Sequence, residues 1–387
     1  MKKRICVLTA TRAEYGLLKP LMEVINKSDK LTLQLLVTGA HLSPEFGLTY
    51  KVIEEDGFQI NEKVEMLLSS DTATSIVKSM GVGMIAFADA LKRLKPDAVV
   101  ILGDRYEMLA AASAASVFKI PIIHLHGGEI TEGAYDDAFR HAITKLSHLH
   151  FTATEEYRKR VIQLGENPEC VYNVGAIGLD NILNLDLLSQ EKLEKELGVK
   201  FKKYNYQVAF HPETLSNIPS AVQFEILLKA IEKQEDSFFI FTKANADTDG
   251  RIINSMMDSF VKKNPEKAKA FTSLGSLRFL SVLKQSDAII GNSSSGIIEA
   301  PSLNIATINI GDRQKGRTQA TSVINCDVDI LQISEAFIKI KHVDFKHKLK
   351  ETKNPYGDGH TANRILEVLE NTSWENMKTK RFYNLNT

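Results

Sequence analysis

Charged side chains follow several short apolar runs of this chain, each directly after the run ends. Asp104 follows one such run, Glu129 and His126 follow the next, and Arg12 follows the first. Carboxylates beside an imidazole can move protons, and a cation beside them can bind an anion. The first hypothesis from these residue types is therefore general acid and base chemistry on a negatively charged substrate.

A further acidic pair opens a segment with helical spacing. Asp136 and Asp137 stand at its start, and apolar residues such as Ile143 recur three and four positions apart on one side. Asp137, His141 and Thr144 fall on the opposite, polar side. One of the two aspartates can serve as the helix cap, so the pattern leaves open which of them takes part in chemistry.

A loop of small residues, Gly291-Asn-Ser-Ser-Ser-Gly296, separates an apolar strand-like run from a helix that Pro301 is expected to interrupt. Hydroxyls and backbone N–H groups of such a loop can converge on one point, where the helix dipole also favours negative charge. Glu299, about one turn further on, can accept the hydroxyls of a ribose or merely complement the dipole. The sequence therefore predicts a phosphate site formed by Asn292, Ser293, Ser294, Ser295 and Gly296.

Basic residues gather in a second loop of the back half. Arg313, Lys315 and Arg317 belong to the glycine-containing run 311–317, and His211 ends another apolar run. These side chains add positive charge and hydrogen-bond donors near the predicted phosphate site. The back half is thus expected to hold phosphate while the front half supplies carboxylates, and a nucleotide diphosphate with an attached group would use both.

The histidines also occur in pairs, His124 with His126 and His148 with His150, which can be interpreted as ligands of a metal ion. Side chains alternate across a strand, however, and neither pair brings a third ligand in its own motif. We therefore predict buried or substrate-contacting imidazoles and no metal site. The first strand-to-helix turn lacks the G-x-G-x-x-G pattern, so no dinucleotide cofactor is expected, and none of another kind is indicated.

Apolar runs and helical segments alternate along the chain, which is typical of parallel sheets covered by helices on both faces. A polar stretch at 189–204 is interpreted as a linker with a surface helix, after which the alternation restarts. The fold class is therefore α/β with two doubly wound domains. The expected strands are 4–10, 31–37, 96–102, 120–125, 148–153 and 171–175, then 207–210, 238–243, 270–274, 288–290 and 305–310.

Composition narrows the class of protein. With 387 residues, 43% hydrophobic and 25% charged residues and a formal net charge of zero, the chain has room for two ordinary cores and no general basic character. We expect no nucleic-acid and no membrane partner. Three widely spaced cysteines and a short apolar run at the N-terminus, too short for a signal peptide, favour a cytoplasmic protein with free thiols.

Seven motifs in a fixed order resemble the hydrolysing UDP-N-acetylglucosamine 2-epimerases, and the bacterial sialic-acid branch most closely. The resemblance covers nearly the whole chain and is more specific than any single motif. The motifs occupy residues 9–16, 103–107, 126–129, 136–145, 211–214, 291–296 and 311–317.

The resemblance implies a GT-B architecture with two Rossmann-like domains and the nucleotide sugar in the cleft between them. The N-terminal domain is expected at 1–178, joined by a C-terminal helix at 360–387, and the nucleotide-binding domain at 179–359. A homodimer is implied by the resemblance alone.

The resemblance also implies a reaction and a set of site residues. UDP is eliminated from UDP-N-acetylglucosamine to give 2-acetamidoglucal, and water addition then releases N-acetylmannosamine for sialic-acid synthesis. Asp104, Glu129 and Asp137 would move protons, with Asp136 not separable from Asp137. This chain has His126 where many relatives carry Glu, so either Glu129 or His126 fills that role. The nucleotide would be bound by Arg12, His211, Ser294, Ser295, Arg313, Glu299 and Phe279.

Three alternatives stay open. The same chemistry on GDP- or UDP-linked N,N′-diacetylbacillosamine is the nearest one. A retaining GT-B glycosyltransferase would need an acceptor and would release no glycal, and the acids in the front half count against it. A non-catalytic sensor of nucleotide sugars would keep its ligand affinity and its output when Asp104 is changed to Asn.

Overall fold

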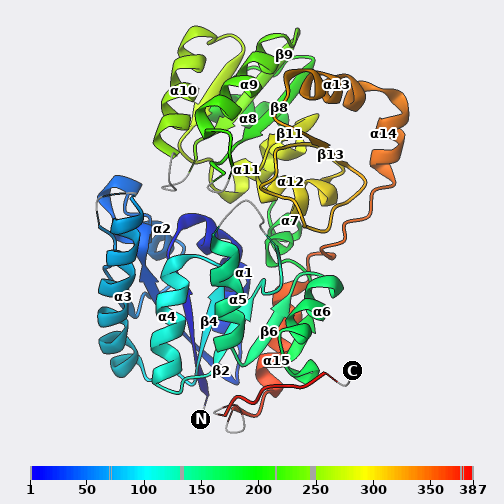
Figure 1. Cartoon of the computed structure of the whole chain (residues 1–387). Helices are drawn as coiled ribbons and strands as arrows, with labels where there is room; N and C mark the ends of the chain where they lie inside the picture. Colours follow the sequence, from blue (N-terminus) through cyan, green and yellow to red (C-terminus); the bar gives the residue numbers. More distant parts are fainter. Residues whose placement is uncertain are drawn as a thin grey trace. The chain divides into compact units, whose positions relative to one another are not determined.

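Two compact α/β units make up the chain in this computed structural model (Figure 1). The first unit contains Met1–Glu129, Asp136–Asn181 and Tyr356–Thr387, and the second contains Ile130–Tyr135 and Ile182–Pro355. The structure describes residues 2–68, 70, 72–130, 135–213, 216–244, 250–374, 377 and 379–385. Thr214, the last residue of the predicted motif 211–214, lies outside these residues.

A seven-stranded sheet forms the centre of the first unit, and all its neighbouring strands are parallel. Strands are added on one side of β1 and then on the other, so the order changes direction between β1 and β4. The carboxyl ends at such a switch point form the usual ligand edge of an α/β sheet. In spatial order the strands are β3 (Glu62–Val64), β2 (Leu31–Thr38), β1 (Lys3–Thr9), β4 (Ala98–Leu102), β5 (Ile122–Leu125), β6 (Leu149–Thr152) and β7 (Val171–Asn173).

Helices cover this sheet and bury two apolar cores against it. Strand β4 is buried along its whole length because both of its faces are covered, which explains its continuous apolar sequence. Alanines of α4 pack closely against α3. The helices are α1 (Arg12–Lys27), α2 (Tyr50–Glu55), α3 (Ala73–Leu94), α4 (Tyr106–Val117), α5 (Asp136–Leu146), α6 (Glu155–Gln163) and α15 (Thr361–Asn371), with α7 (Asp180–Asn184) at the boundary of the two units.

Helix α3 is long and apolar enough, by length and composition alone, to cross a membrane. Among the described residues it is the one helix with these properties. Here it packs against α4 and β3 and buries Phe87, Ala90 and Leu91 in the core. Core helices share the same length and composition, so this feature is weak evidence for a membrane span.

The C-terminal helix is shorter than the expected 360–387. Helix α15 packs against α1 and buries Ile365 and Leu369, but it ends at Asn371. There the side chains of Asn371 and Thr372 donate to the carbonyl oxygens of Glu367 and Val368, at 2.9 and 2.7 Å. Such side-chain bonds compete with continued helix, so the chain leaves α15 and runs on without regular structure over 379–385.

The second unit is built on a six-stranded sheet, again with all neighbouring strands parallel. Its order changes direction between β8 and β11, which places the ends of these two strands at the switch point. The two parallel sheets confirm the α/β class. In spatial order the strands are β10 (Ala268–Phe271), β9 (Ser237–Thr242), β8 (Tyr204–Ala209), β11 (Ala288–Gly291), β12 (Ala306–Ile310) and β13 (Val323–Cys326).

The polar stretch 189–204 contains a helix, as expected. This helix is α8, whose Leu193 and Leu197 are buried against β9 residues Phe238 and Ile240. The stretch looked polar because only two of the eight helix residues face the core. The helices of the second unit are α8 (Gln190–Leu197), α9 (Ser220–Glu232), α10 (Gly250–Lys263), α11 (Gly275–Lys284), α12 (Ser294–Ile298), α13 (Ile330–Lys341) and α14 (Val343–Lys350), with a 3₁₀ turn at Ala300–Leu303.

Candidate active site

Arg140 joins the two predicted carboxylates at the sheet edge of the first unit. Its Nη2 donates to Asp104 Oδ2, and its Nη1 donates to Glu129 Oε2 at 3.3 Å. Burial lowers the pKa of Arg140, but the charges of Asp104 and Glu129 outweigh burial and raise it. The guanidinium therefore stays charged and holds both carboxylates. The sequence analysis did not name Arg140, although a basic residue one turn after an acidic helix start was a usable signal.

The acids of this cluster differ in how far a ligand can reach them. The side chains of Asp104 and Asp137 are 23% and 26% exposed, whereas that of Glu129 is only 3% exposed. Asp104 and Asp137 are therefore open to a ligand, and Asp136 is half-buried as well, so exposure does not separate the two aspartates of α5. Glu129 is enclosed and serves as an anchor for its neighbours.

His126 is one of those neighbours, and both of its ring nitrogens have protein partners. The backbone N–H of Ile177 donates to Nε2 at 3.3 Å, so the proton of the neutral ring is on Nδ1, which lies 2.7 Å from Glu129 Oε1. His126 also has a φ of 64°, a left-handed conformation that costs energy for a residue other than glycine. The ring is therefore committed to orienting Glu129.

Helix α5 carries the acidic pair and begins at Asp136, so both aspartates lie in its first turn, where they complement the helix dipole. Asp137 Oδ2 lies 3.5 Å from His141 Nε2. Thr144, expected on the polar side, is fully buried. The expectation was wrong because Thr144 meets a buried imidazole, and its hydroxyl lies 3.1 Å from His124 Nδ1.

His124 connects helix α5 to the turn that carries Asp104. Its Nε2 lies 2.8 Å from the carbonyl oxygen of Gly103, which can only accept, so Nε2 carries the proton and Nδ1 accepts from Thr144. Burial lowers the pKa of His124 to about 3, so the ring is neutral. In the second histidine pair, His150 Nε2 lies 2.9 Å from Glu166. Each of these imidazoles thus serves a neighbouring protein group.

Arg12 is the first residue of α1, at the end of β1. The helix start is fixed by a capping box in which the Thr11 hydroxyl accepts from Glu14 N and Glu14 Oε2 accepts from Thr11 N. Glu14 is also close to Arg105, with 4.0 Å between Oε1 and Nε. Burial raises the pKa of Glu14 to about 7, although Arg105 opposes the shift.

In the second unit, Asn292 ties together the ends of β8 and β11. Its side chain is fully buried, accepts from His211 N at 2.7 Å and donates to His211 O at 2.8 Å. Its own carbonyl oxygen accepts from Arg313 Nη1 at 3.0 Å and from Gln314 Nε2 at 2.8 Å. Asn292, predicted as a ligand contact, thus holds the groups around the predicted site.

The serine loop forms as expected, with Ser293 as the N-cap of α12. Gly291 has a φ of 128°, and a Cβ there would collide with the carbonyl of Ala209, so only glycine fits. Helix α12 has five residues and stops before the turn that contains Pro301. Glu299 lies at the C-cap and is mostly buried, so the interpretation of Glu299 as a complement to the N-terminal dipole is wrong.

The basic loop 311–317 is organised by two residues that the sequence analysis did not select. Glu213, which is 7% exposed, accepts from Arg313 N at 3.1 Å, and burial raises its pKa. Gln314 is fully buried and donates to Asn292. Arg317 Nε donates to Ile130 O at 3.2 Å. Glu213 stood in a motif already noted, so it was within reach of sequence reasoning, whereas the amide of Gln314 carried no signal.

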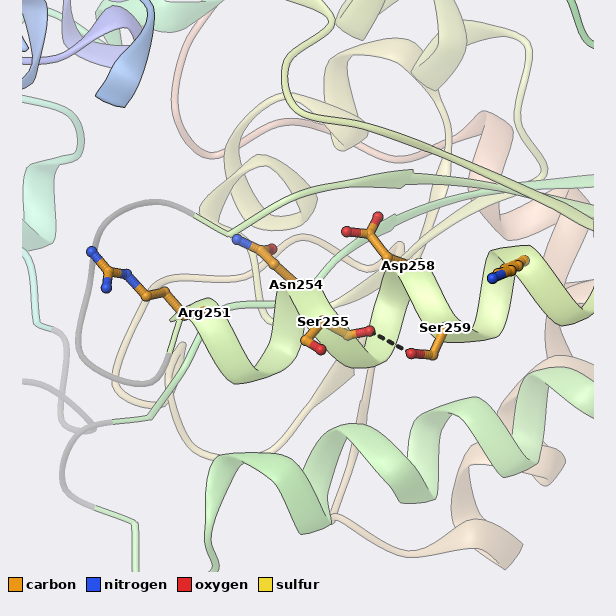
Figure 2. Close-up of a pocket in the computed structure, with 6 residues that line it drawn as sticks. Arg251, Asn254, Ser255, Asp258 and Ser259 are labelled. Atoms are coloured by element: carbon orange, nitrogen blue, oxygen red, sulfur yellow. Dashed lines mark hydrogen bonds between the residues drawn. The ribbon is translucent and has the colours of Figure 1, made fainter. Parts of the chain in front are cut away.

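Phe279 lies on α11, partly buried between two apolar clusters of the second unit. A surface depression on α10 is a separate feature, and Figure 2 shows the polar side chains along this helix. Two of these side chains already have protein partners. Asn254 accepts from the backbone N–H of Ala244 and donates to its carbonyl oxygen, and Asp258 forms an ion pair with Lys243 at 2.7 Å. None of the predicted site residues lines this depression.

The fold and these residues define an α/β protein of two units. The sheet of the first unit carries an acid cluster at its ligand edge, and the sheet of the second unit carries loops lined by serine and arginine. A family model described as UDP-N-acetylglucosamine 2-epimerase matches residues 23–370. The chain therefore belongs to the UDP-N-acetylglucosamine 2-epimerase family, and it is an enzyme, a hydrolysing nucleotide-sugar 2-epimerase.

Individual relatives agree with this family. The chain is 46% identical to the GDP/UDP-N,N′-diacetylbacillosamine 2-epimerase (hydrolyzing) of Campylobacter jejuni, over 99% of this chain and all of that protein. It is 41% identical to the polysialic acid biosynthesis protein P7 of Escherichia coli, over 99% and 98% of the two chains. The structure of the UDP-GlcNAc 2-epimerase from Neisseria meningitidis bound to UDP-GlcNAc has a TM-score of 0.80 at 19% identity, over 95% and 99%. This likeness confirms the GT-B-type fold.

Proposed function

We propose that this protein hydrolyses a UDP- or GDP-linked N,N′-diacetylbacillosamine and releases the free sugar with inverted configuration at C2. The observation that carries the proposal is the 46% identity, over essentially both full lengths, to the Campylobacter jejuni protein named for this activity. The sequence motifs alone favour UDP-N-acetylglucosamine. The full-length relation favours the alternative substrate.

The proposed reaction has two steps. In the first, the C1–O bond breaks with its electron pair leaving on the diphosphate, and a base takes the C2 proton, which leaves a double bond between C1 and C2. In the second, the oxygen of water joins C1 while a base takes a proton from that water, and an acid gives a proton to C2 from the opposite face. The C2 proton is not acidic by itself, so the C1–O bond to the diphosphate must break ahead of proton removal. Hydrogen-bond donors to the phosphate oxygens therefore contribute most to stabilising the transition state.

We assign diphosphate binding mainly to the second unit and the proton transfers to the first. The diphosphate is assigned to side chains of the second unit, His211, Ser294, Ser295 and Arg313. Arg12 of the first unit is assigned the same role. Asp104 and Asp137 are assigned the proton transfers, because their carboxylates are partly exposed whereas that of Glu129 is enclosed. Such groups typically supply about 10²–10⁴-fold each. Glu299 and Phe279 are assigned the ribose and the base.

A second candidate substrate is UDP-N-acetylglucosamine, with N-acetylmannosamine as the product. It is supported by the 41% identity to the polysialic acid biosynthesis protein of Escherichia coli, again over nearly the full length. Both candidates share the same bond changes at C1 and C2. They differ in the substituents at C4 and C6 of the sugar and, for the GDP-linked form, in the nucleotide.

The experiment is to incubate the protein with UDP-diacetylbacillosamine, GDP-diacetylbacillosamine and UDP-N-acetylglucosamine in D₂O, and to follow released sugar by proton NMR. We expect the highest kcat/KM for a diacetylbacillosamine substrate, with deuterium at C2 of the product. Asp104→Asn should lose turnover by about 10²-fold or more while its affinity for UDP stays unchanged. No free sugar from any of the three, or sugar only when an acceptor alcohol is present, would overturn the proposal.

A further inference from the structure

The C-terminal segment 379–385 packs against the end of helix α5, the helix that carries Asp137 and Arg140. We propose that Lys380 is a positioning residue that holds α5, and through it the acid cluster, in place for the reaction. The proposal rests on the proposed function, because it concerns the same site. It adds a residue that lies far along the chain from every site motif.

Lys380 binds the C-terminal end of α5 directly. Its Nζ donates to the carbonyl oxygen of Thr144 at 3.2 Å and to that of Ser147. The last carbonyl groups of a helix have no partner within the helix, and a cation there also complements the dipole. Lys380 therefore supplies both a cap and a charge to the end of α5.

Glu166 holds Lys380 at this position. Its side chain is 4% exposed and lies 2.7 Å from Lys380 Nζ, 2.6 Å from Lys145 Nζ and 2.9 Å from His150 Nε2. Burial alone would raise the pKa of Glu166, but the hydrogen bonds from His150 and the two lysines lower it to about 2. Glu166 is thus a permanent anion that connects the C-terminal segment to α5 and β6.

The end of α5 is connected to the acids by the helix itself and by a chain of buried bonds. Within α5, Arg140 binds Asp104 and Glu129. One turn further on, Thr144 contacts His124, and His124 donates to the carbonyl of Gly103 beside Asp104. A shift of α5 would therefore move the guanidinium and the Asp104 turn together.

The rest of the segment is attached through few groups, so it can be altered without emptying a core. Tyr383 N donates to Gly165 O at 2.9 Å, and the Phe382 ring packs on Gly165. Lys145 Nζ lies 4.7 Å from the centre of that ring, a cation–π contact. Phe382 is itself 67% exposed, so its loss should loosen the segment and leave the two cores intact.

The contacts of Lys380 with the end of α5 and with Glu166, here called the clamp, depend on the charge of Lys380. They are therefore sensitive to alkaline pH. Burial lowers the pKa of Lys380 to about 8, and Glu166 opposes the shift while Lys145 adds to it. The other titratable groups that face this cluster are His148, His150 and Cys170. Below about pH 8 the lysine is charged and the clamp is closed, and as pH rises through that value the ion pair with Glu166 is lost.

The test compares Lys380→Met, Lys380→Arg and Phe382→Ala with Arg381→Met, a change at the neighbouring exposed residue. We expect Lys380→Met to lower kcat about tenfold, the effect of roughly one lost charged hydrogen bond, with KM and UDP affinity within about twofold of wild type. Phe382→Ala should have a smaller effect in the same direction. Lys380→Arg should keep kcat near the wild-type value. The fall of kcat at alkaline pH should move above pH 9 in this variant, since arginine stays protonated.

Amide hydrogen exchange of residues 136–147 provides a readout that does not depend on activity. Lys380→Met should speed exchange in α5 by about tenfold, and Arg381→Met should not. The proposal would be overturned if Lys380→Met left amide exchange in α5 unchanged. It would also be overturned if the active variant kept the kcat of the wild type and the same fall of kcat at alkaline pH. Absence of sugar release by the wild type would instead overturn the proposed function, while the exchange experiment would still decide the role of Lys380.

Discussion

His126 Nδ1 lies 2.7 Å from Glu129 Oε1, and the backbone N–H of Ile177 on the other ring nitrogen determines that Nδ1 carries the proton. The Nδ1–H of the imidazole therefore faces Glu129, and Glu129 also accepts a hydrogen bond from Arg140. The sequence left open whether His126 or Glu129 replaces a glutamate found in relatives. In this structure the two residues lie in one charged cluster with Arg140 and Asp104.

The first prediction concerns His126→Asn. Asparagine tolerates the left-handed backbone at this position but is too short to contact Glu129 and Ile177 together. We expect kcat to fall about 10- to 100-fold through loss of the hydrogen bond from Ile177 N and of the close contact with Glu129, with UDP affinity unchanged. Steady-state kinetics and UDP titration measure both quantities. A variant with wild-type kcat would show that the orientation of Glu129 is unimportant.

The second prediction concerns Arg140. Arg140→Met leaves the carboxylates of Asp104 and Glu129 without their shared cation, so the free energy of unfolding should fall by about 3–5 kcal/mol. Arg140→Lys keeps the charge but cannot contact both acids with two nitrogens, and we expect an intermediate loss. Urea denaturation followed by circular dichroism gives the values. Equal stability of Arg140→Met and wild type would contradict the bridging role.

The third prediction separates holding from binding in the second unit. Asn292→Ala removes the side chain that joins both backbone groups of His211, so we expect a loss of about 1–3 kcal/mol in stability and weaker UDP binding. Ser294→Ala is the matched comparison, for which we expect weaker UDP binding at unchanged stability. Calorimetric titration with UDP and thermal unfolding distinguish the two. Reversed results would mean that Asn292 contacts the ligand and Ser294 supports the loop.

The fourth prediction uses the raised pKa of Glu14, about 7, which burial causes. Between its ordinary value near 4.5 and 7, the folded protein binds a proton that the unfolded chain has released, so this residue lowers stability as pH rises through that window. Glu14→Gln should lose less stability than wild type between pH 5 and pH 7, by about 2–3 kcal/mol. Exposed Glu55→Gln is the control. Parallel pH profiles for Glu14→Gln and wild type would contradict the shift.

The homodimer implied by the family resemblance stays a prediction, and α3 is where it can be tested. Val77, Met84 and Ile85 are exposed on this helix. If a second copy covers them, Ile85→Glu should halve the mass measured by sedimentation, whereas Ile338→Glu, at an exposed position of α13, should not change it. A wild-type protein that sediments as a monomer would contradict the prediction itself.

Regular elements were the most predictable part of the fold. Runs such as 96–102 could be assigned as buried strands because parallel strands covered on both faces need apolar residues without alternation. Short edge strands such as β3 and β13 were not expected, since three or four residues carry too little pattern. Helix α8 was expected as a surface helix within the polar stretch 189–204, because Leu193 and Leu197 alone mark its buried side.

The sequence by itself determined the α/β class, the family, and which residues stand at strand ends, because side-chain periodicity and motif order are properties of neighbours along the chain. Only the tertiary structure decided that β4 lies beside β1, that Arg140 of α5 binds two carboxylates that follow β4 and β5, and that Asn292 supports His211. The physical reason is that a buried polar group must find a partner, and that partner is chosen by chain crossings, which leave no local pattern.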